Sequence, residues 1–142
     1  GGLMSGIALA FEGESPDTRL WTAEPEGHDD WRRSLEAGEI SANAPGTRSI
    51  CDAILTPQPG KLTWQVCSRL VSGGFAVTDE QVFEAMRLAF RHLKVVVEPG
   101  GAAALAAALF AMPEVAKGQS VGVMLTGGNV DAGLYAKVLQ AA

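Results

Sequence analysis

The sequence contains little cysteine and little charge for its length. Two cysteines and 19% charged residues occur among the 142 residues of the chain. Cys51 and Cys67 fit no metal-binding or redox spacing, which argues against a secreted disulfide scaffold and favours a reducing, cytoplasmic setting. We interpret both as small buried hydrophobic side chains rather than as nucleophiles.

Positive charge is also scarce. The 11 Lys and Arg residues stand against 16 Asp and Glu, which gives a formal net charge of −5. Because no block of basic residues is present, the chain offers little countercharge to nucleic acid or to an anionic membrane. The longest run of apolar and small residues, 100–112, is too short to span a bilayer. We therefore expect no nucleic-acid partner and no membrane insertion.

Familiar catalytic motifs are missing as well. The sequence has no G-x-S-x-G nucleophile elbow, no P-loop, no H-E-x-x-H motif and no complete dinucleotide fingerprint. What is present is 47% apolar residues, which excludes a disordered chain and suggests surfaces that are shared with a partner. The length suits one domain or one piece of a larger domain. The chain opens without an initiating Met and reads as a sequence entered midway.

Short strands and helices alternate along the chain. Hydrophobic spacing predicts strands over residues 19–23, 75–77, 94–97 and 120–125, and helices over residues 3–11, 29–37, 62–71, 78–93, 102–112 and 131–140. The predicted strands lack polar alternation and most are followed by a helix, which is typical of an α/β fold with a mostly parallel sheet and helices on both faces. Residues 41–60 have no sustained period and predict a long loop, a kind of segment that often carries function.

The clearest local signals mark helix ends. Thr78 and Gln81 have the spacing of a capping box, and Gly38 is a stop signal after residues 29–37. Behind Thr78, six apolar residues fall on one predicted helical face: Val82, Phe83, Met86, Ala89, Phe90 and Leu93.

Pairs of glycines lie at expected strand-to-helix transitions. They are Gly1-Gly2, Gly100-Gly101 and Gly127-Gly128. In an open α/β sheet, ligands bind beyond the carboxyl ends of the strands, and glycines there let main-chain N–H groups approach an anion. Each pair taken alone is explained as well by a tight turn, so the pairs do not identify a ligand.

Acidic residues gather just after the first predicted strand. Glu24 and Asp30, with an intervening main-chain carbonyl, offer the hard oxygen ligands that Mg²⁺ and Ca²⁺ prefer. The alternative is that acids simply favour the first turn of the helix that follows. His28 has no second His or Cys nearby, so we do not expect zinc.

Ordered motifs give the chain a family resemblance. Residues 1–8 (GGLMSGIA), 23–25 (AEP), 97–102 (VEPGGA) and 125–131 (LTGGNVD) resemble the C-terminal half of the serine/threonine dehydratase and serine racemase family. Residues 49–53 (SICDA) also resemble a loop of that family. Its members are fold-type II pyridoxal-phosphate enzymes. The resemblance covers essentially all 142 residues and implies the C-terminal part of the large catalytic domain.

The resemblance also assigns roles to particular residues. The positions that match cofactor-binding residues of the family are Gly1, Gly2, Leu3, Glu98, Thr126 and Gly127. The first three match the end of the glycine loop around the cofactor phosphate, and Glu98 matches a glutamate near the ring. Thr126 matches the hydroxyl position that faces the pyridine nitrogen, where Ser or Cys is more common.

A divalent-cation site is implied in the same way. Glu24, the carbonyl of His28 and Asp30 match a site for Mg²⁺, Mn²⁺ or Ca²⁺ that many members possess. The match favours a metal role for these residues over a purely local role at the start of a helix.

The lysine that carries the cofactor in this family belongs to an N-terminal motif that these residues do not contain. The lysines present, Lys61, Lys94, Lys117 and Lys137, lie in none of the matching contexts. We therefore expect the chain to be inactive alone and to need the N-terminal half of the enzyme as partner. The resemblance also leads us to expect a homodimer.

The reaction that the resemblance implies is pyridoxal-phosphate-dependent dehydration and deamination of L-threonine or L-serine to a 2-oxo acid and ammonia. Within the enzyme class, the alternatives are hydroxyaspartate dehydration and serine racemisation. Outside it, the alternative is a non-catalytic phosphate-binding or dimerisation module.

Overall fold

The computed structural model describes residues 1–141. Its strands are β1 (Trp21–Pro25) and β2 (Gly73–Val77). Its helices are α1 (Gly2–Glu14), α2 (Asp30–Ala37), α3 (Lys61–Leu70), α4 (Asp79–Leu88), α5 (Pro99–Ala106), α6 (Pro113–Ala116) and α7 (Ala132–Gln140). A 3₁₀ turn occupies Asp52–Ile54, and single π-helical turns extend α4 over Ala89–Leu93 and α5 over Ala107–Ala111.

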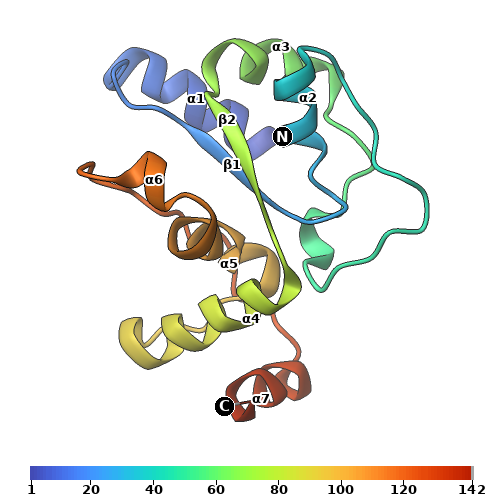
Figure 1. The fold of residues 1–142 in the computed structure, drawn as a ribbon, viewed down its shortest axis with the longest axis vertical. Coiled ribbons are helices and arrows are strands. Elements are labelled where there is room, and N and C mark those ends of the chain that lie inside the picture. Colours follow the sequence, from blue (N-terminus) through green and yellow to red (C-terminus); the bar gives the residue numbers. More distant parts are fainter. Residues whose placement is uncertain (142) are drawn as a thin grey trace.

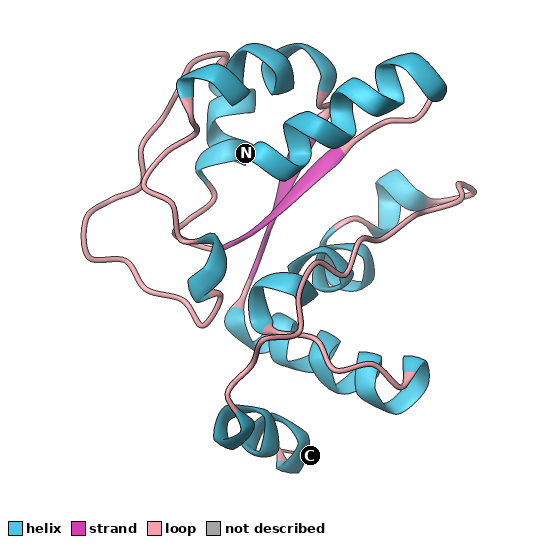
Figure 2. Cartoon of the chain, turned by 180° about the vertical axis from the view of Figure 1, so that it is seen from behind, coloured by secondary structure: helices cyan, strands magenta, loops and turns pink. Residues whose placement is uncertain are grey.

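The two strands form a parallel pair between two groups of helices. Trp21 lies opposite Gly73, and Pro25 lies opposite Val77. Figure 1 shows α1, α2 and α3 on one side of the strands and α4, α5 and α7 on the other, and Figure 2 shows the same division from behind. This arrangement confirms the predicted α/β class with a parallel sheet that has helices on both faces.

Each side of the sheet has its own hydrophobic core. The larger core lies around α4 and α5, and its fully buried side chains include Val77, Val82, Met86 and Val97. Many of its other members are alanines of α5, which allow the helices to approach closely. The smaller core contains Ala8, Trp31, Cys67 and Val71. Cys51 and Cys67 are both buried and free, as predicted.

Helix ends follow the sequence signals. Thr78 accepts a hydrogen bond from the N–H of Gln81, whose side chain accepts one from the N–H of Thr78, so the capping box is confirmed. Gly38 ends α2 in a left-handed conformation with φ of 75°. The predicted apolar face behind Thr78 is right in its first turns, but at the π-helical end Leu93 is 55% exposed.

Two predicted strands are absent from the described residues. Residues 94–97 and 120–125 are extended or irregular, Lys94 has a left-handed φ of 61°, and Val96 and Met124 are 53% and 58% exposed. β-Branched residues favour an extended backbone, but a strand requires a neighbour that completes its hydrogen bonds. No such ladder forms along these segments in residues 1–141.

The glycine pair at residues 100–101 was also expected in a turn, and the structure places it elsewhere. α5 begins at Pro99, so Gly100 and Gly101 lie buried in its first turn. Proline suits this first helical position because the N–H that it lacks would have no helical partner there. Within the part of the chain that is described, no helix has the length and apolar character needed to cross a membrane.

Candidate functional site

The start of α5 packs directly against the turn at Gly127-Gly128. The N–H of Glu98 donates to the carbonyl of Gly127 at 2.9 Å, and the N–H of Asn129 donates to Oε2 of Glu98 at 2.9 Å. Two sequence motifs that are far apart in the chain therefore meet at one place. This junction brings together Glu98 and Gly127, with Thr126 next to it in the chain.

The glycines at this junction are required by space. A Cβ atom on Gly127 would lie 2.6 Å from Oε1 of Glu98, and one on Gly101 would lie 2.7 Å from the carbonyl oxygen of Gly127. Gly128 is nearly as tight, since a Cβ there would lie 3.0 Å from the carbonyl oxygen of Val96. None of the three has a left-handed φ, so turn conformation does not explain them. Gly101 and Gly128 are explained by close approach of main chains, and Gly127 by its contact with the Glu98 carboxylate.

Thr126 lies at the edge of the junction and is exposed to solvent. Its hydroxyl makes no hydrogen bond to another of the described residues, which leaves it free to donate to a ligand. The local alternative, in which the hydroxyl caps the following turn, finds no support in this geometry.

The N-terminal glycines lie in a different part of the fold. Figure 1 shows the N-terminus beside α2 and α3, across the strands from α5 and α7. A Cβ on Gly1 would overlap the ring of Trp31, and Leu3 is exposed. In the described residues, no hydrogen bond joins Gly1, Gly2 or Leu3 to the junction at Glu98. The structure therefore brings together only part of the predicted cofactor-binding set.

Glu24 ends β1 and anchors the next helix. Its Oε1 accepts the N–H of Trp31 at 3.0 Å, and its Oε2 accepts the N–H of Arg32 at 2.9 Å. Burial raises the pKa of Glu24 to about 7, although these two N–H groups act in the opposite direction. Glu24 thus performs the local role at a helix start that was the alternative to metal binding, and each oxygen keeps a further lone pair.

Asp29 and Asp30 are neighbours in the sequence with opposite surroundings. Asp29 forms ion pairs with both Arg32 and Arg33. Burial raises the pKa of Asp29, but the hydrogen bonds from the two arginines outweigh it and lower the pKa overall. Asp30 is 1% exposed, and burial raises its pKa. Its Oδ1 accepts from Asn43, and its Oδ2 is buried with no partner.

The described residues do not build a complete side-chain site for the predicted cation. Among the residues that the structure describes, no three His, Cys, Asp or Glu side chains form a group that would hold a metal. The predicted set has two carboxylates and the carbonyl of His28, and waters would have to complete the shell around a hard cation. The ring of His28 faces the hydroxyl of Thr47 at 3.3 Å.

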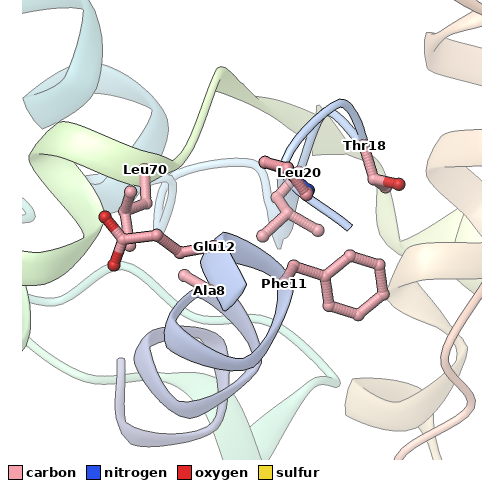
Figure 3. A pocket seen from close by; sticks show the side chains of 7 residues that line it. Ala8, Phe11, Glu12, Thr18, Leu20 and Leu70 are labelled. Carbon is pink, nitrogen blue, oxygen red and sulfur yellow. The ribbon is translucent and has the colours of Figure 1, made fainter. Parts of the chain in front are cut away.

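One cavity lies beside the acidic cluster, and another lies against α1. A space of about 330 Å³ lies under the long loop and is lined in part by His28, Asn43 and Thr47. Sequence reasoning missed Asn43, for which the only signal was the predicted loop over residues 41–60. A second space of about 220 Å³ lies between α1 and the start of β1, where Phe11 and Leu20 line it (Figure 3). It contains none of the predicted site residues.

Known proteins match this chain over most of its length. The family model described as "Pyridoxal-phosphate dependent enzyme" matches residues 1–127. The beta-hydroxyaspartate dehydratase of Paracoccus denitrificans is 42% identical over 132 residues, which cover 92% of this chain and 41% of that protein. The serine racemase of Oryza sativa subsp. indica is 42% identical over 141 residues, which cover 94% of this chain and 40% of that protein.

Solved structures give the same result. Maize serine racemase has a TM-score of 0.87 and is 40% identical. The match covers 96% of this chain and 42% of the racemase chain. The T.th. threonine deaminase has a TM-score of 0.85 and is 40% identical. The match covers 92% of this chain and 43% of the deaminase chain. The chain therefore spans about two fifths of the length of the relatives that it matches.

Proposed function

We propose that this chain is the C-terminal part of the catalytic domain of an amino-acid dehydratase, because it belongs to the family of pyridoxal-phosphate dependent enzymes. Its fold is that of the fold-type II members of the serine/threonine dehydratase type. The proposed reaction converts a β-hydroxy amino acid such as L-threonine or L-serine to a 2-oxo acid and ammonia. The observation that carries the proposal is the junction at which the Glu98 and Gly127 motifs meet.

We propose that the residues of this junction border bound pyridoxal phosphate. Gly101, Gly127 and Gly128 keep the main chains close, and a methyl group on any of them would crowd the junction. When it is bound, pyridoxal phosphate supplies an electron sink for negative charge at the substrate Cα. In our proposal, Glu98 lies near the cofactor ring, and Gly1, Gly2 and Leu3 present N–H groups at the start of α1 to the phosphate.

Thr126 sets the electronic character of the site in this proposal. A neutral hydroxyl donates a hydrogen bond to an unprotonated pyridine nitrogen, whereas a carboxylate at this position would hold that nitrogen protonated. The hydroxyl thus leaves a weaker electron sink, which suits elimination of a β-hydroxyl group better than transamination. The exposure of the Thr126 side chain supports this role.

A divalent cation at Glu24, the carbonyl of His28 and Asp30 is a separate part of the proposal. The unpartnered, buried Oδ2 of Asp30 supports it, because a buried carboxylate oxygen without a partner is unfavourable. Mg²⁺, Mn²⁺ and Ca²⁺ all accept oxygen ligands of this kind. The ion would neutralise the acidic cluster and fix the end of β1.

The assembled enzyme needs more than this chain in our proposal. The N-terminal half of the enzyme supplies the lysine that carries the cofactor, and the complete protein is a homodimer. The two free, buried cysteines support a reducing, cytoplasmic setting. Hydroxyaspartate is the second candidate substrate, because a relative with 42% identity is named for that activity.

The test is reconstitution. The chain is mixed with the N-terminal half of the Paracoccus relative, supplied with pyridoxal phosphate, and assayed for 2-oxo acids from L-threonine, L-serine and 3-hydroxyaspartate. Chiral chromatography of serine measures racemisation in the same samples. We expect 2-oxo acid from the mixture and none from either half alone. A complex that binds the cofactor without elimination or racemisation would favour the non-catalytic phosphate-binding module instead.

A further inference from the structure

We propose that Asn43 is a positioning residue for the cation site, and that it couples cation binding at Asp30 to closure of the loop over residues 41–60. This inference rests on the proposed cation site and extends it to a residue that belongs to none of the sequence motifs. It does not depend on the identity of the amino-acid substrate.

The side chain of Asn43 joins three parts of the fold. Its Nδ2 donates to Oδ1 of Asp30 at 2.7 Å and to the carbonyl of Thr56 at 2.8 Å, while its Oδ1 accepts from Arg33 at 2.6 Å. A guanidinium group donates and never accepts, so Arg33 fixes the amide oxygen on its own side. The NH₂ group is then held toward Asp30.

Because the amide of Asn43 is neutral, its contact with Asp30 leaves the negative charge of the carboxylate available to a cation. Both arginines of the first turns of α2 form ion pairs with Asp29 instead. Asp30 receives a neutral amide, which orients the carboxylate at Oδ1 and leaves the buried Oδ2 without a partner. A cation ligand requires both properties, a fixed orientation and an oxygen that still carries unpaired charge.

The same amide closes the long loop. The side chain of Asn43 contacts Thr56, and its main-chain N–H donates to the carbonyl of Pro57 at 2.8 Å. The beginning and the end of the loop are therefore joined at the residue that orients Asp30. Further along, the hydroxyl of Ser49 donates to Asp79 at the start of α4 at 2.6 Å. The space of about 330 Å³ lies beneath the closed loop.

These contacts make loop closure and cation binding mutually dependent. An open loop would release Asn43 and with it the orientation of Asp30, so the closed form binds the cation more tightly. By linkage, the cation must stabilise the closed loop by the same factor. Arg48 lies exposed in the middle of the loop, which gives a site where trypsin reports on opening.

The experiment measures Mn²⁺ binding by calorimetry and the rate of tryptic cleavage after Arg48, on the 142-residue chain, with and without Mn²⁺. We expect Mn²⁺ to bind and to slow cleavage. In Asn43→Ala, we expect the Mn²⁺ affinity to fall about tenfold or more, and Mn²⁺ to lose its effect on cleavage.

The matched control is Ser34→Ala. The hydroxyl of Ser34 accepts from the N–H of Ser41 at 2.9 Å, so this variant weakens the start of the loop without touching Asp30. We expect it to speed cleavage and to lower the Mn²⁺ affinity much less than Asn43→Ala does, because the closed loop stays the main form and Asn43 still contacts Asp30. Equal losses of affinity in Ser34→Ala and Asn43→Ala, or an unchanged affinity in Asn43→Ala, would overturn the positioning role.

Two further readouts keep the test decisive. If Asn43→Ala does not fold, Arg33→Lys decides, because it keeps the charge and removes the fork that reaches the amide oxygen. We expect a smaller loss of affinity there, and no loss overturns the proposal. If the unaltered chain binds no Mn²⁺, the positioning role fails together with the cation site, whereas the dehydratase proposal is judged separately by turnover in the reconstituted protein.

Discussion

Gly101 lies so close to the main chain of Gly127 that it has no room for a side chain. A Cβ on Gly101 would lie 2.7 Å from the carbonyl oxygen and 2.8 Å from the nitrogen of Gly127. Both neighbouring atoms belong to the main chain, so they have no flexible side chain with which to move aside. The contact joins α5 to the segment that carries Thr126, and it sets the shape of the candidate cofactor site.

We expect Gly101→Ala to lower the free energy of unfolding by about 1–3 kcal/mol, because the added methyl group forces the Gly127 turn to shift. Urea denaturation measures the change. The adjacent Gly100→Ala is the control, since the nearest atom to its Cβ would lie 3.5 Å away, in ordinary contact. It should be neutral or slightly stabilising, because alanine is a better helix residue than glycine. Equal destabilisation in the two variants would contradict this account.

Helix boundaries could be predicted from the sequence because their causes are local. The Thr78–Gln81 capping box and the Gly38 stop are set by residues within one turn of the helix end, and both are confirmed. The missing strands over residues 94–97 and 120–125 have the opposite cause. Their β-branched residues favour extension, but pairing depends on a neighbouring strand that no local pattern specifies.

The site could be predicted only as far as its motifs reached. The Glu98 and Gly127 motifs were found, but the reason for the glycines is an approach between distant segments, and the turns expected from composition were wrong for Gly100-Gly101. Asn43 belongs to no motif, and the role proposed for it depends on contacts with Asp30 and Thr56, each 13 residues away. Such a contact becomes visible only when the loop is folded.

A second prediction concerns Cys51. It is fully buried, and burial raises the pKa of its thiol to about 11. Because the thiolate is the reactive species, we expect almost no alkylation by iodoacetamide at pH 8 in the folded protein. Cys67 is also buried with a raised pKa and should behave in the same way. Mass spectrometry counts the labelled cysteines. Both should react in guanidinium chloride, and rapid labelling without denaturant would show that the core opens.

A third prediction separates the two roles of Glu24. Without cation, Glu24→Ala should lower the melting temperature, because the N–H groups of Trp31 and Arg32 lose their acceptor at a cost of about 0.5–2 kcal/mol. With Mg²⁺ or Mn²⁺ at 100 times its dissociation constant, the unaltered protein should gain about 2.7 kcal/mol, and the variant much less.

Thermal melts in EDTA and in excess cation measure both effects. Glu36→Ala is a suitable control, because Glu36 pairs with Arg32 at the exposed side of α2 and lies outside the predicted ligand set. It should keep the response to cation. If cation changes the melting temperature of neither the unaltered protein nor Glu24→Ala, then Glu24 acts only at the start of the helix.

The last prediction rests on the hydroxyl of Thr126. In the reconstituted enzyme, Thr126→Ser should keep the hydrogen bond to the pyridine nitrogen and most of the activity. Thr126→Ala should leave that nitrogen without its donor and weaken both cofactor retention and turnover. Loss of such a bond costs about 1–3 kcal/mol, which corresponds to an effect of about 5- to 150-fold. Cofactor titrations and steady-state kinetics, normalised to folded protein, measure the two losses.

Thr126→Asp distinguishes an electronic role from a structural one. A carboxylate at this position should favour a protonated pyridine nitrogen, shift the absorbance of the cofactor and divert flux toward side reactions at the substrate Cα. A residue that only stabilised the end of its segment would behave differently. Its replacement by Ala would then cost stability, while the cofactor spectrum and the kinetics per folded molecule stayed unchanged. Because Thr126 is exposed and makes no hydrogen bond within the described residues, we expect the electronic outcome.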